Sequence, residues 1–398
     1  MRVLMVSDVY FPRINGVSTS IETFRRCLAA EGVEVRLVVP QYGDEAATPD
    51  ILRVPGRPVP GDPEDRLPGW RAMQQAVVAA AADCDLIHIQ TPFVAHYAGL
   101  RAARRLDLPV LATYHTLFEE YVEHYAPRWL RRLAAGGLRA AARAWSRQQC
   151  NQLDALVVPS GLMRLRLEGY GVTTPMSVLP TGIPLGQFAT GDRAAFRQRY
   201  GIAAERPLAL YVGRVAHEKN IGFLLQAMPL LLERCPEALL LIAGEGPALP
   251  ALQRQVAAAG LQQQVRFLGY LDRQRDLPDC YAAADVFAFA SRTETQGLVL
   301  LEAMAAGLPV VALAEMGTVD ILGSGRGCRV PPGEPGAFAA ALADCLKQPA
   351  LRQQQGHEAS VLAAEWSDQA MAARLAALYR DLCAEPRRRP ARLRSVGA

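Results

Sequence analysis

The chain has 398 residues, which is more than one compact hydrophobic core usually holds, so its length predicts two domains. An apolar fraction of 51% and a charged fraction of 21% are those of a soluble globular protein, and they exclude a chain that is disordered throughout. The net charge is +4, and five positive charges lie in Arg387–Arg394, which we interpret as a solvated tail. No nucleic-acid partner is predicted.

Membrane-spanning and zinc-binding proteins are also disfavoured. The longest apolar stretch, Val299–Met316, contains two glutamates, a glycine and a proline, which is not the pattern of a spanning helix. Met1 and Arg2 lead into a strand-like run rather than a secretory leader. The eight cysteines include no C-x-x-C pair, and their scatter favours reduced thiols in a cytoplasmic protein.

Short apolar segments with strand character alternate with helical patterns along the whole chain. In the first half we expect strands at Val3–Ser7, Val33–Val39, Leu86–Gln90, Val110–Tyr114 and Ala155–Pro159. In the second half we expect them at Leu208–Val212, Ala238–Ala243, Val265–Leu268, Val286–Ala290 and Val310–Leu313. Most of these segments are continuously hydrophobic, which is typical of parallel strands covered on both faces. The sequence therefore predicts βαβ units and parallel sheets.

The alternation pauses between Gly182 and Gly201, where turn-forming residues dominate. We therefore expect two doubly wound Rossmann-like α/β domains, facing each other across a cleft at the carboxyl ends of their strands. The predicted divisions are residues 1–185, residues 186–365, a helix over 366–384 that returns to the first domain, and a basic flexible tail over 385–398. The proline- and glycine-rich segment Tyr42–Pro68 is predicted to be an irregular loop.

Two loops carry candidate phosphate contacts. Gly16 precedes an apolar helix, but the first βα turn lacks the G-x-G-x-x-G pattern, so a nicotinamide dinucleotide is disfavoured. A bare glycine at a helix N-terminus suits an anionic group, although an ordinary turn explains it equally well. In the second half, Gly213 begins a loop with Arg214 and Lys219. The planar guanidinium of Arg214 and the compact ammonium group of Lys219 suit a diphosphate. The alternative is that both are solvated cations at the rim of a cleft.

Two carboxylates eight residues apart straddle a predicted strand-to-helix junction. Glu294 lies in the loop, and Glu302 lies within an otherwise apolar helix, where an unpaired carboxylate would be costly. One carboxylate could hold a ribose and the other a sugar ring, with the amides of three loop residues, Gln296, Gly297 and Leu298, facing the phosphates between them. The alternative is a helix-capping Glu294 and a solvent-facing Glu302.

Together these motifs resemble the family 4 retaining glycosyltransferases, which have the GT-B fold. Over nearly the whole chain, the resemblance rests on the N-terminal glycine loop, the G-R-x-x-x-E-K-N segment over 213–220, the turn over 244–247, the Phe-Leu-Gly-Tyr segment over 267–270 and the E-x(7)-E element over 294–302. It implies an enzyme that moves a hexose from a nucleotide sugar to a hydroxyl. No metal ion or other cofactor is expected, and the nucleotide sugar is a co-substrate.

The resemblance also implies roles for residues. In this family the C-terminal domain binds the donor and the N-terminal domain the acceptor. Glu302 would bind the ribose, and Glu294 would bind the donor sugar together with the backbone amides. Arg214 and Lys219 would bind the diphosphate. Further donor contacts would come from Gly16, Gly213, Gly269 and Tyr270, with the last two flanking the base. His115, at the end of a predicted strand, matches the family's active-site histidine; without the resemblance, a structural histidine would be the better interpretation. The D-x-D sequence at Asp83 lies at the wrong end of its strand for a metal site.

The acceptor is the least determined partner. The segment Arg128–Arg147 is basic and amphipathic, which is typical either of a helix on an anionic membrane surface or of a domain-packing helix with a solvated arginine face. The residues over 115–121 and 294–298 are most similar to bacterial diacylglycerol α-glucosyltransferases, which use UDP-glucose. We therefore expect a peripheral enzyme on the inner face of the cell membrane with a lipid acceptor, or otherwise a glycan acceptor. The alternatives are a GDP-mannose-dependent α-mannosyltransferase, a sugar-nucleotide epimerase and a non-catalytic nucleotide-sugar-binding protein.

Overall fold

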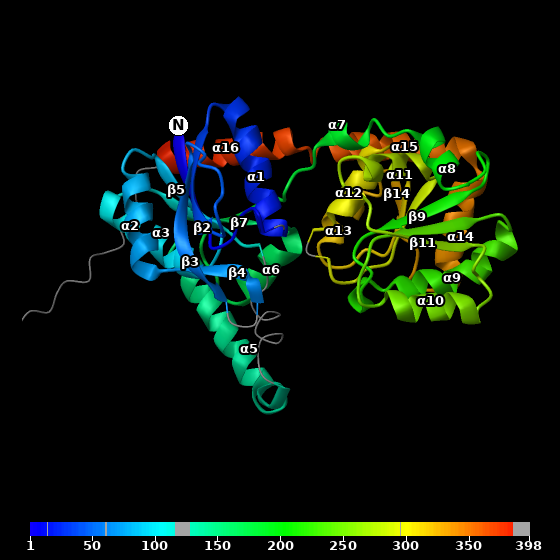
Figure 1. Ribbon diagram of the computed structural model, residues 1–398, viewed down its shortest axis with the longest axis horizontal. Helices are drawn as coiled ribbons and strands as arrows, with labels where there is room; N and C mark the ends of the chain where they lie inside the picture. Colours follow the sequence, from blue (N-terminus) through cyan, green and yellow to red (C-terminus); the bar gives the residue numbers. More distant parts are fainter. Residues whose placement is uncertain (14, 60–61, 116–127, 295, 385–398) are drawn as a thin grey trace, which may run out of the picture. The chain divides into compact units, whose positions relative to one another are not determined.

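The computed structural model describes residues 1–13, 15–59, 62–115, 128–294 and 296–384 (Figure 1). It divides into two compact units, which are described separately below. Unit 1 contains Met1–Val158, Arg166–Leu179 and the chain from Ala372 onward, whereas unit 2 contains Pro159–Leu165 and Pro180–Met371. The boundary predicted between residues 185 and 186 falls inside unit 2, shortly after the chain enters it at Pro180.

Unit 1 is built on an eight-stranded sheet with the order β4-β3-β2-β1-β5-β6-β7-β8. All neighbouring pairs are parallel except β3 and β4. The strands are β1 (Arg2–Val6), β2 (Glu34–Gln41), β3 (Ile51–Val59), β4 (Asp62–Pro68), β5 (Leu86–Ile89), β6 (Val110–Thr113), β7 (Ala155–Val158) and β8 (Met176–Val178). The apolar side chains of β1, β2, β5, β6 and β7 are buried on both faces, as the continuous hydrophobic runs predicted.

The predicted irregular loop over Tyr42–Pro68 is wrong, because most of it forms the antiparallel pair β3 and β4. The first half of β3 pairs with β2, and only its second half pairs with β4. Pro58 therefore lies where β3 has a single neighbouring strand, and there a missing amide hydrogen costs little. The abundance of proline and glycine hid this pair in the sequence.

The helices of unit 1 cover both faces of its sheet. They are α1 (Gly16–Leu28), the 3-10 turn η1 (Ala29–Glu31), α2 (Trp70–Ala81), α3 (Val94–Leu106), α5 (Arg128–Cys150), α6 (Gly161–Gly169) and α16 (Asp368–Ala384), the last two having residues in both units. Figure 1 shows α2 and α3 on one side of the sheet and α1 on the other. The end of α16 is fixed to the sheet by a hydrogen bond of 2.6 Å between the hydroxyl of Tyr379 and Nδ1 of the buried His88.

Unit 2 contains a wholly parallel six-stranded sheet with the order β11-β10-β9-β12-β13-β14. Its strands are β9 (Leu208–Val212), β10 (Leu239–Ala243), β11 (Val265–Gly269), β12 (Val286–Phe289), β13 (Val310–Ala312) and β14 (Cys328–Arg329). Its helices are α7 (Leu185–Phe188), α8 (Arg193–Arg199), η2 (His217–Lys219), α9 (Ile221–Arg234), α10 (Leu249–Ala258), α11 (Asp276–Ala283), α12 (Leu298–Ala305), α13 (Thr318–Leu322), α14 (Pro335–Lys347) and α15 (Pro349–Ala364). In Figure 1, α9 and α10 lie on one side of the sheet and α11 and α15 on the other.

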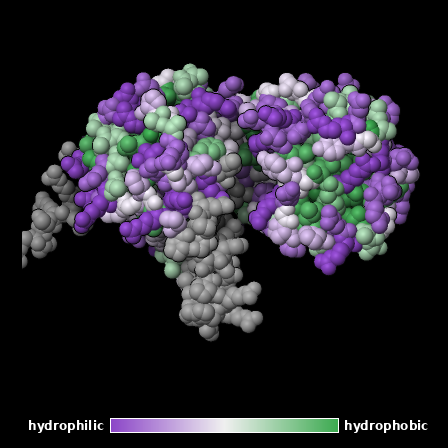
Figure 2. Space-filling model, in the orientation of Figure 1, coloured by the Kyte–Doolittle hydropathy of each residue, from purple (hydrophilic) through white to green (hydrophobic). Residues whose placement is uncertain are grey.

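The ten strands expected from the sequence all form, within one or two residues of their predicted ends. Besides β3 and β4, the sequence missed the short edge strands β8 and β14, which are too short to show a hydrophobic pattern. The surface drawn in Figure 2 is mostly polar, with smaller apolar areas between. Among the described residues, no helix is both long and apolar enough to span a membrane.

Candidate active site

In unit 2 the candidate residues gather where the strand order reverses. The chain builds β9, β10 and β11 outward and then returns, so that β12 lies on the other side of β9. Loops at such a switch point diverge at the carboxyl ends of the strands and leave room for a ligand. The loop after β9 carries Arg214 and Lys219, and the loop after β12 carries Glu294.

An ion pair joins these two loops. Nζ of Lys219 lies 2.6 Å from Oε1 of Glu294, and both side chains are about one-fifth exposed. Asn220 also binds across the loops, because its amide group donates to the carbonyl of Ala290. Arg214 is two-thirds exposed, and within the described part of the chain its guanidinium has only a distant contact of 3.8 Å with Glu218. The structure thus brings Lys219 and Glu294 together and leaves the guanidinium of Arg214 open to solvent.

Glycines at the ends of β9, β10 and β11 form a bare backbone surface. Gly244 has a φ of +137°, and a Cβ there would lie 1.9 Å from the carbonyl oxygen of Gly213. A Cβ on Gly246 would lie 2.3 Å from the carbonyl of Val215. The amide of Gly244 donates to the carbonyl of Gly269, which ties the third loop to the second. Only glycine permits such close approach of three loops, and the exposed Tyr270 follows directly.

The amides predicted to face phosphates lie at the start of α12. Gly297 is the N-cap residue with a φ of +84°, and Leu298 is the first helical residue. The helix N-terminus carries a partial positive charge and unsatisfied amides, which favours an anion. The side chain of Gln296 serves another purpose: it accepts from the amide of Thr181 at 3.1 Å and donates to its carbonyl at 2.6 Å. Only the main chain of Gln296 remains available to a ligand.

Glu302 is completely buried in α12, so the solvent-facing alternative is wrong. Its Oε2 accepts a hydrogen bond of 2.9 Å from Tyr281, and its Oε1 forms an ion pair with Arg273. Burial raises the pKa of Glu302, whereas Arg273 and Tyr281 oppose that rise. Sequence reasoning missed both partners, because nothing in the spacing of Arg273 or Tyr281 distinguishes them from other surface and core residues. Arg273 is half-exposed and stacks over Phe188.

In unit 1 the same kind of switch point lies between β1 and β5. Gly16 begins α1, and the side chain of Asn15 caps this helix by accepting from the amide of Ser18 at 2.9 Å. Ser18 is buried, and its hydroxyl is one of the buried groups without a hydrogen-bond partner in the described structure. Gly16 is exposed, and a Cβ there would meet no atom within 4 Å, so the space around it is open.

His115 follows β6 and lies beside the end of β5. Its Nε2 is 3.0 Å from Oε1 of Gln90, and because a carbonyl oxygen only accepts, Nε2 must carry the hydrogen. Burial lowers the pKa of His115 to about 4, so the imidazole is neutral at physiological pH. Sequence reasoning missed Gln90, although its place directly after a buried strand offered a signal.

His115 and Gln90 line a cavity of about 480 Å³ that lies entirely within unit 1. Most of its wall is apolar, with contributions from β5, β6, β7, α3 and α5. Asp8 is also part of the wall and accepts hydrogen bonds from Thr91 and from the amide of Ala95, which caps α3. Burial raises the pKa of Asp8 to about 6.

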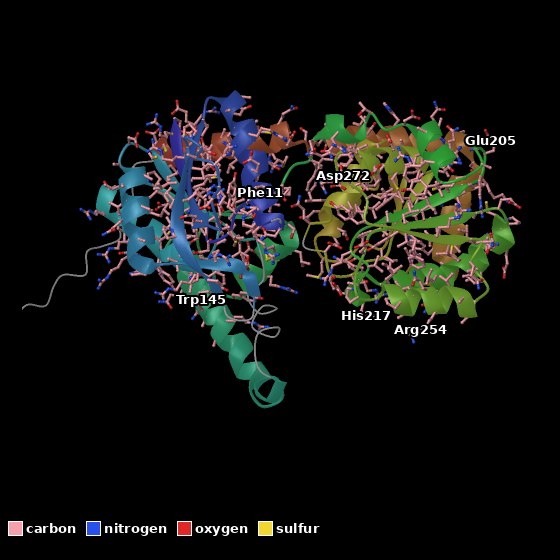
Figure 3. The ribbon with its side chains drawn as sticks, in the orientation of Figure 1. Phe11, Trp145, Glu205, His217, Arg254 and Asp272 are labelled. Atoms are coloured by element: carbon pink, nitrogen blue, oxygen red, sulfur yellow. The ribbon has the colours of Figure 1, made fainter. Side chains whose placement is uncertain are left out.

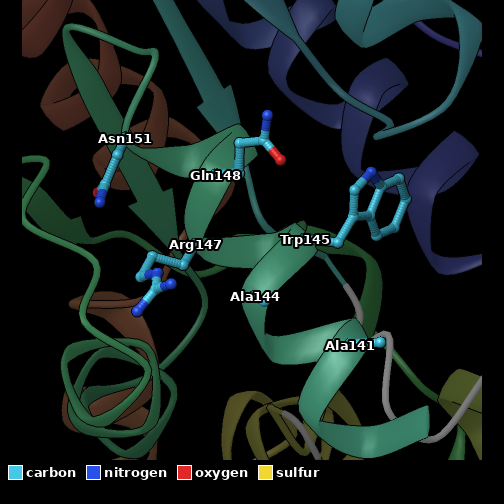
Figure 4. A pocket seen from close by; sticks show the side chains of 6 residues that line it. All are labelled: Ala141, Ala144, Trp145, Arg147, Gln148 and Asn151. Carbon is cyan, nitrogen blue, oxygen red and sulfur yellow. The ribbon is translucent and has the colours of Figure 1, made fainter.

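The basic segment forms the long helix α5. Ala142, Ser146 and Gln149 of this helix face the core, whereas Ala141 is exposed. Trp145 and Arg147 point to opposite sides of the helix (Figure 4) and line a shallow surface hollow. Of the arginines that suggested a basic face, Arg143 stacks on the ring of Tyr170, and the side chains of Arg128, Arg131, Arg132 and Arg139 lie outside the described residues.

No cluster of metal-ligating side chains occurs in the described part of the chain. The D-x-D sequence is occupied by ion pairs, because Asp83 binds Arg2 and Arg36.

Family profiles match both halves of this arrangement. The profile described as Glycosyltransferase Family 4 matches residues 14–187, and that described as Glycosyl transferases group 1 matches residues 192–361. The chain is 33% identical over 320 residues to an alpha-monoglucosyldiacylglycerol synthase of Streptococcus pneumoniae, an alignment that covers 78% of this chain and 71% of the relative. The chain belongs to glycosyltransferase family 4.

Two further comparisons give a second sequence relative and a structural neighbour of this family 4 enzyme. It is 28% identical over 343 residues to a GDP-mannose-dependent alpha-mannosyltransferase of Mycobacterium tuberculosis, covering 84% of this chain and 85% of that one. The structure of Anabaena Alr3699/HepE in complex with UDP superimposes with a TM-score of 0.75 at 18% identity, covering 96% of this chain and all of that one. The fold is therefore GT-B, and the protein is a retaining hexosyltransferase that uses a nucleotide sugar.

Proposed function

We propose that this enzyme transfers glucose from UDP-glucose to the hydroxyl of a membrane lipid such as diacylglycerol. The observation that carries the lipid acceptor is an aromatic patch on unit 1, formed by Trp70, Phe93, Tyr97 and Trp145. The rings of Trp70 and Tyr97 are 6.3 Å apart, those of Phe93 and Trp145 are 6.4 Å apart, and Trp145 donates a hydrogen bond of 3.0 Å to the hydroxyl of Tyr97.

The patch resembles the surface of a peripheral membrane protein. Trp70, Phe93 and Tyr97 are between 39% and 47% exposed, although large aromatic side chains are usually buried. Tyrosine and tryptophan favour the boundary between water and lipid, because one end of each side chain is apolar and the other is polar. Trp145 lies where α5 joins the body of unit 1 (Figure 3). Similarity to the diacylglycerol glucosyltransferase supports the same acceptor class.

Unit 2 supplies the groups for the donor. In the proposed assignment, Glu302 binds the ribose once Arg273 has turned away from its carboxylate, and the glycine surface and Tyr270 border the base. The amides at the start of α12, together with Arg214 and Lys219, neutralise the diphosphate as its negative charge grows in the transition state. Glu294 holds the sugar once Lys219 has turned from it to the phosphates. For unit 1, the proposed roles are contact of Gly16 with the donor phosphates and a hydrogen bond from the sugar to the neutral imidazole of His115.

Retention of configuration requires attack on the face from which the diphosphate leaves. We propose that a diphosphate oxygen takes the proton of the acceptor hydroxyl while the bond between the sugar and the diphosphate breaks. The sugar passes through an oxocarbenium-like state, and its carbon forms the new bond with the acceptor oxygen. The protein then contributes positioning and charge neutralisation rather than a covalent nucleophile.

The test is a product assay. Purified protein is incubated with labelled UDP-glucose or labelled GDP-mannose, with and without diacylglycerol vesicles, and the products are extracted into organic solvent. Labelled lipid from UDP-glucose alone is the expected result. Similarity to the mycobacterial enzyme makes transfer from GDP-mannose the second candidate. Label that stays in the aqueous phase with both donors would refute the lipid acceptor.

A further inference from the structure

We propose that the cavity bordered by the aromatic patch binds one acyl chain of the acceptor, and that His96 hydrogen-bonds to an ester oxygen of that lipid. This inference rests on the lipid acceptor of the proposed function. It adds a binding site for an acyl chain and a residue, His96, that recognises the ester bond between this acyl chain and its headgroup.

The first argument is the shape and composition of the cavity. Its volume of about 480 Å³ lies within the range of about 300–1,000 Å³ that is common for small-molecule sites. Leu153 and Leu156 form part of its apolar wall, and Cys150 adds a thiol whose pKa is raised to about 12 by burial, so that it carries no charge. A hydrocarbon chain matches this apolar part of the wall, whereas Asp8, Gln90 and His115 make another part of it polar.

The second argument is the position of the cavity between two different surroundings. Phe93 and Trp145 belong both to its wall and to the exposed aromatic patch, so one part of the cavity borders the surface proposed to meet the membrane. Gln90 and His115 form another part of the same wall. A chain that enters from the membrane would therefore bring its headgroup hydroxyl toward His115 while the hydrocarbon stays in apolar surroundings.

The third argument is an unsatisfied polar atom in this wall. His96, in the first turn of α3, is 3% exposed, and its Nε2 is a buried atom without a hydrogen-bond partner in the described structure. Burial lowers the pKa of His96 to about 4, so the ring is neutral. An unpaired buried group of this kind costs about 1–3 kcal/mol, and native proteins rarely retain one without a partner. His96 lines the cavity, and in the proposed complex it carries its hydrogen on Nε2 and donates it to the carbonyl oxygen of an ester.

The location of the site is tested without any nucleotide sugar. A monoacylglycerol with a diazirine in its acyl chain is bound to the full-length protein, irradiated and mapped by peptide mass spectrometry. Cross-links within residues 89–96 and 149–156 are expected. Cross-links confined to the exposed face of α5 would overturn the proposal. Because no donor is present, a failed UDP-glucose assay would refute the donor assignment and leave this result standing.

The role of His96 is tested with His96→Phe, which keeps a ring of similar size and removes the unsatisfied atom. The variant should be at least as heat-stable as the wild type, because no buried hydrogen bond is lost. Its affinity for the ester probe should fall by about 2- to 10-fold, whereas an ether-linked analogue should bind wild type and variant alike. The matched control is His357→Phe, which changes an exposed histidine of α15. Equal binding of ester and ether by the wild type would refute the role of His96.

Discussion

Removing Arg273 should destabilise unit 2 in a manner that depends on pH. Its guanidinium is the cationic partner of the fully buried Glu302, and the only other contact to that carboxylate from a described side chain is the hydroxyl of Tyr281. Breaking a buried ion pair by removing one partner costs about 3–5 kcal/mol. Since Arg273 is half-exposed and water screens part of the interaction, we expect a loss of about 2–3 kcal/mol for Arg273→Ala at pH 8.

The pH dependence follows from the direction of the Glu302 pKa. Burial raises this pKa, and removing Arg273 removes an opposing charge, so the pKa rises further in the variant. A carboxyl whose folded pKa is raised favours folding most at low pH, and this contribution is lost as pH rises through the folded pKa. The difference between wild type and Arg273→Ala should therefore be smaller at pH 5 than at pH 8.

The assay is thermal unfolding at both pH values, in which a loss of 2–3 kcal/mol corresponds to a fall in Tm of about 4–12 °C for a domain of this size. Arg275→Ala, two residues along the chain at an exposed position, is the matched control and should change Tm little. An equal effect of both variants, or a loss for Arg273→Ala that grows toward pH 5, would refute the reasoning.

Four further outcomes are expected. Glu294→Gln should lower kcat/KM at least about 100-fold with labelled donor while leaving Tm within a few degrees, since it is only partly buried; unchanged transfer would remove its proposed role. Gly244→Ala should cost at least about 3 kcal/mol in urea unfolding, because its Cβ would clash with the Gly213 carbonyl. The wild type should lose about 3 kcal/mol of stability between pH 4 and 7, because folding favours the protonated form of Asp8 until the pH passes its pKa of about 6. Asp8→Asn should not show this loss, and parallel pH profiles of the two proteins would contradict the prediction. Trp70→Ser should weaken co-sedimentation with anionic vesicles about 10-fold, whereas Val361→Ser, an exposed apolar residue of unit 2, should not.

The sequence was sufficient for the parallel strands, because each central strand is a short apolar segment bounded by polar or turn-forming residues. Leu208–Val212 is such a segment, and β9 has these bounds. The strands β3 and β4 were not predicted, because their prolines and glycines are more typical of loops than of strands. Hydrophobic periodicity indicates burial, and β3 and β4, at the edge of the sheet, have too few buried side chains to show such a pattern.

The candidate site was predictable to the extent that its residues carry rare chemistry within a fixed spacing. Glu302 stood out as an acidic residue in an apolar helix, and the structure confirms its burial. Its partners Arg273 and Tyr281 lie 29 and 21 residues away in sequence, on a different loop and helix. Contacts over such separations depend on the fold, so the local pattern could not reveal them. Gln90 and His96 were missed for the same reason.

Burial separates the chemical roles of the proposed catalytic groups. Arg214 is two-thirds exposed and Lys219 about one-fifth exposed, so both cations retain some contact with water. His115 is partly buried, its lowered pKa keeps the ring neutral, and its Nε2–H donates to Oε1 of Gln90. None of the described groups donates a hydrogen bond to its Nδ1. The lone pair on Nδ1 is then the part of the ring that can accept a hydrogen bond from a hydroxyl, a role that a protonated imidazole could not perform.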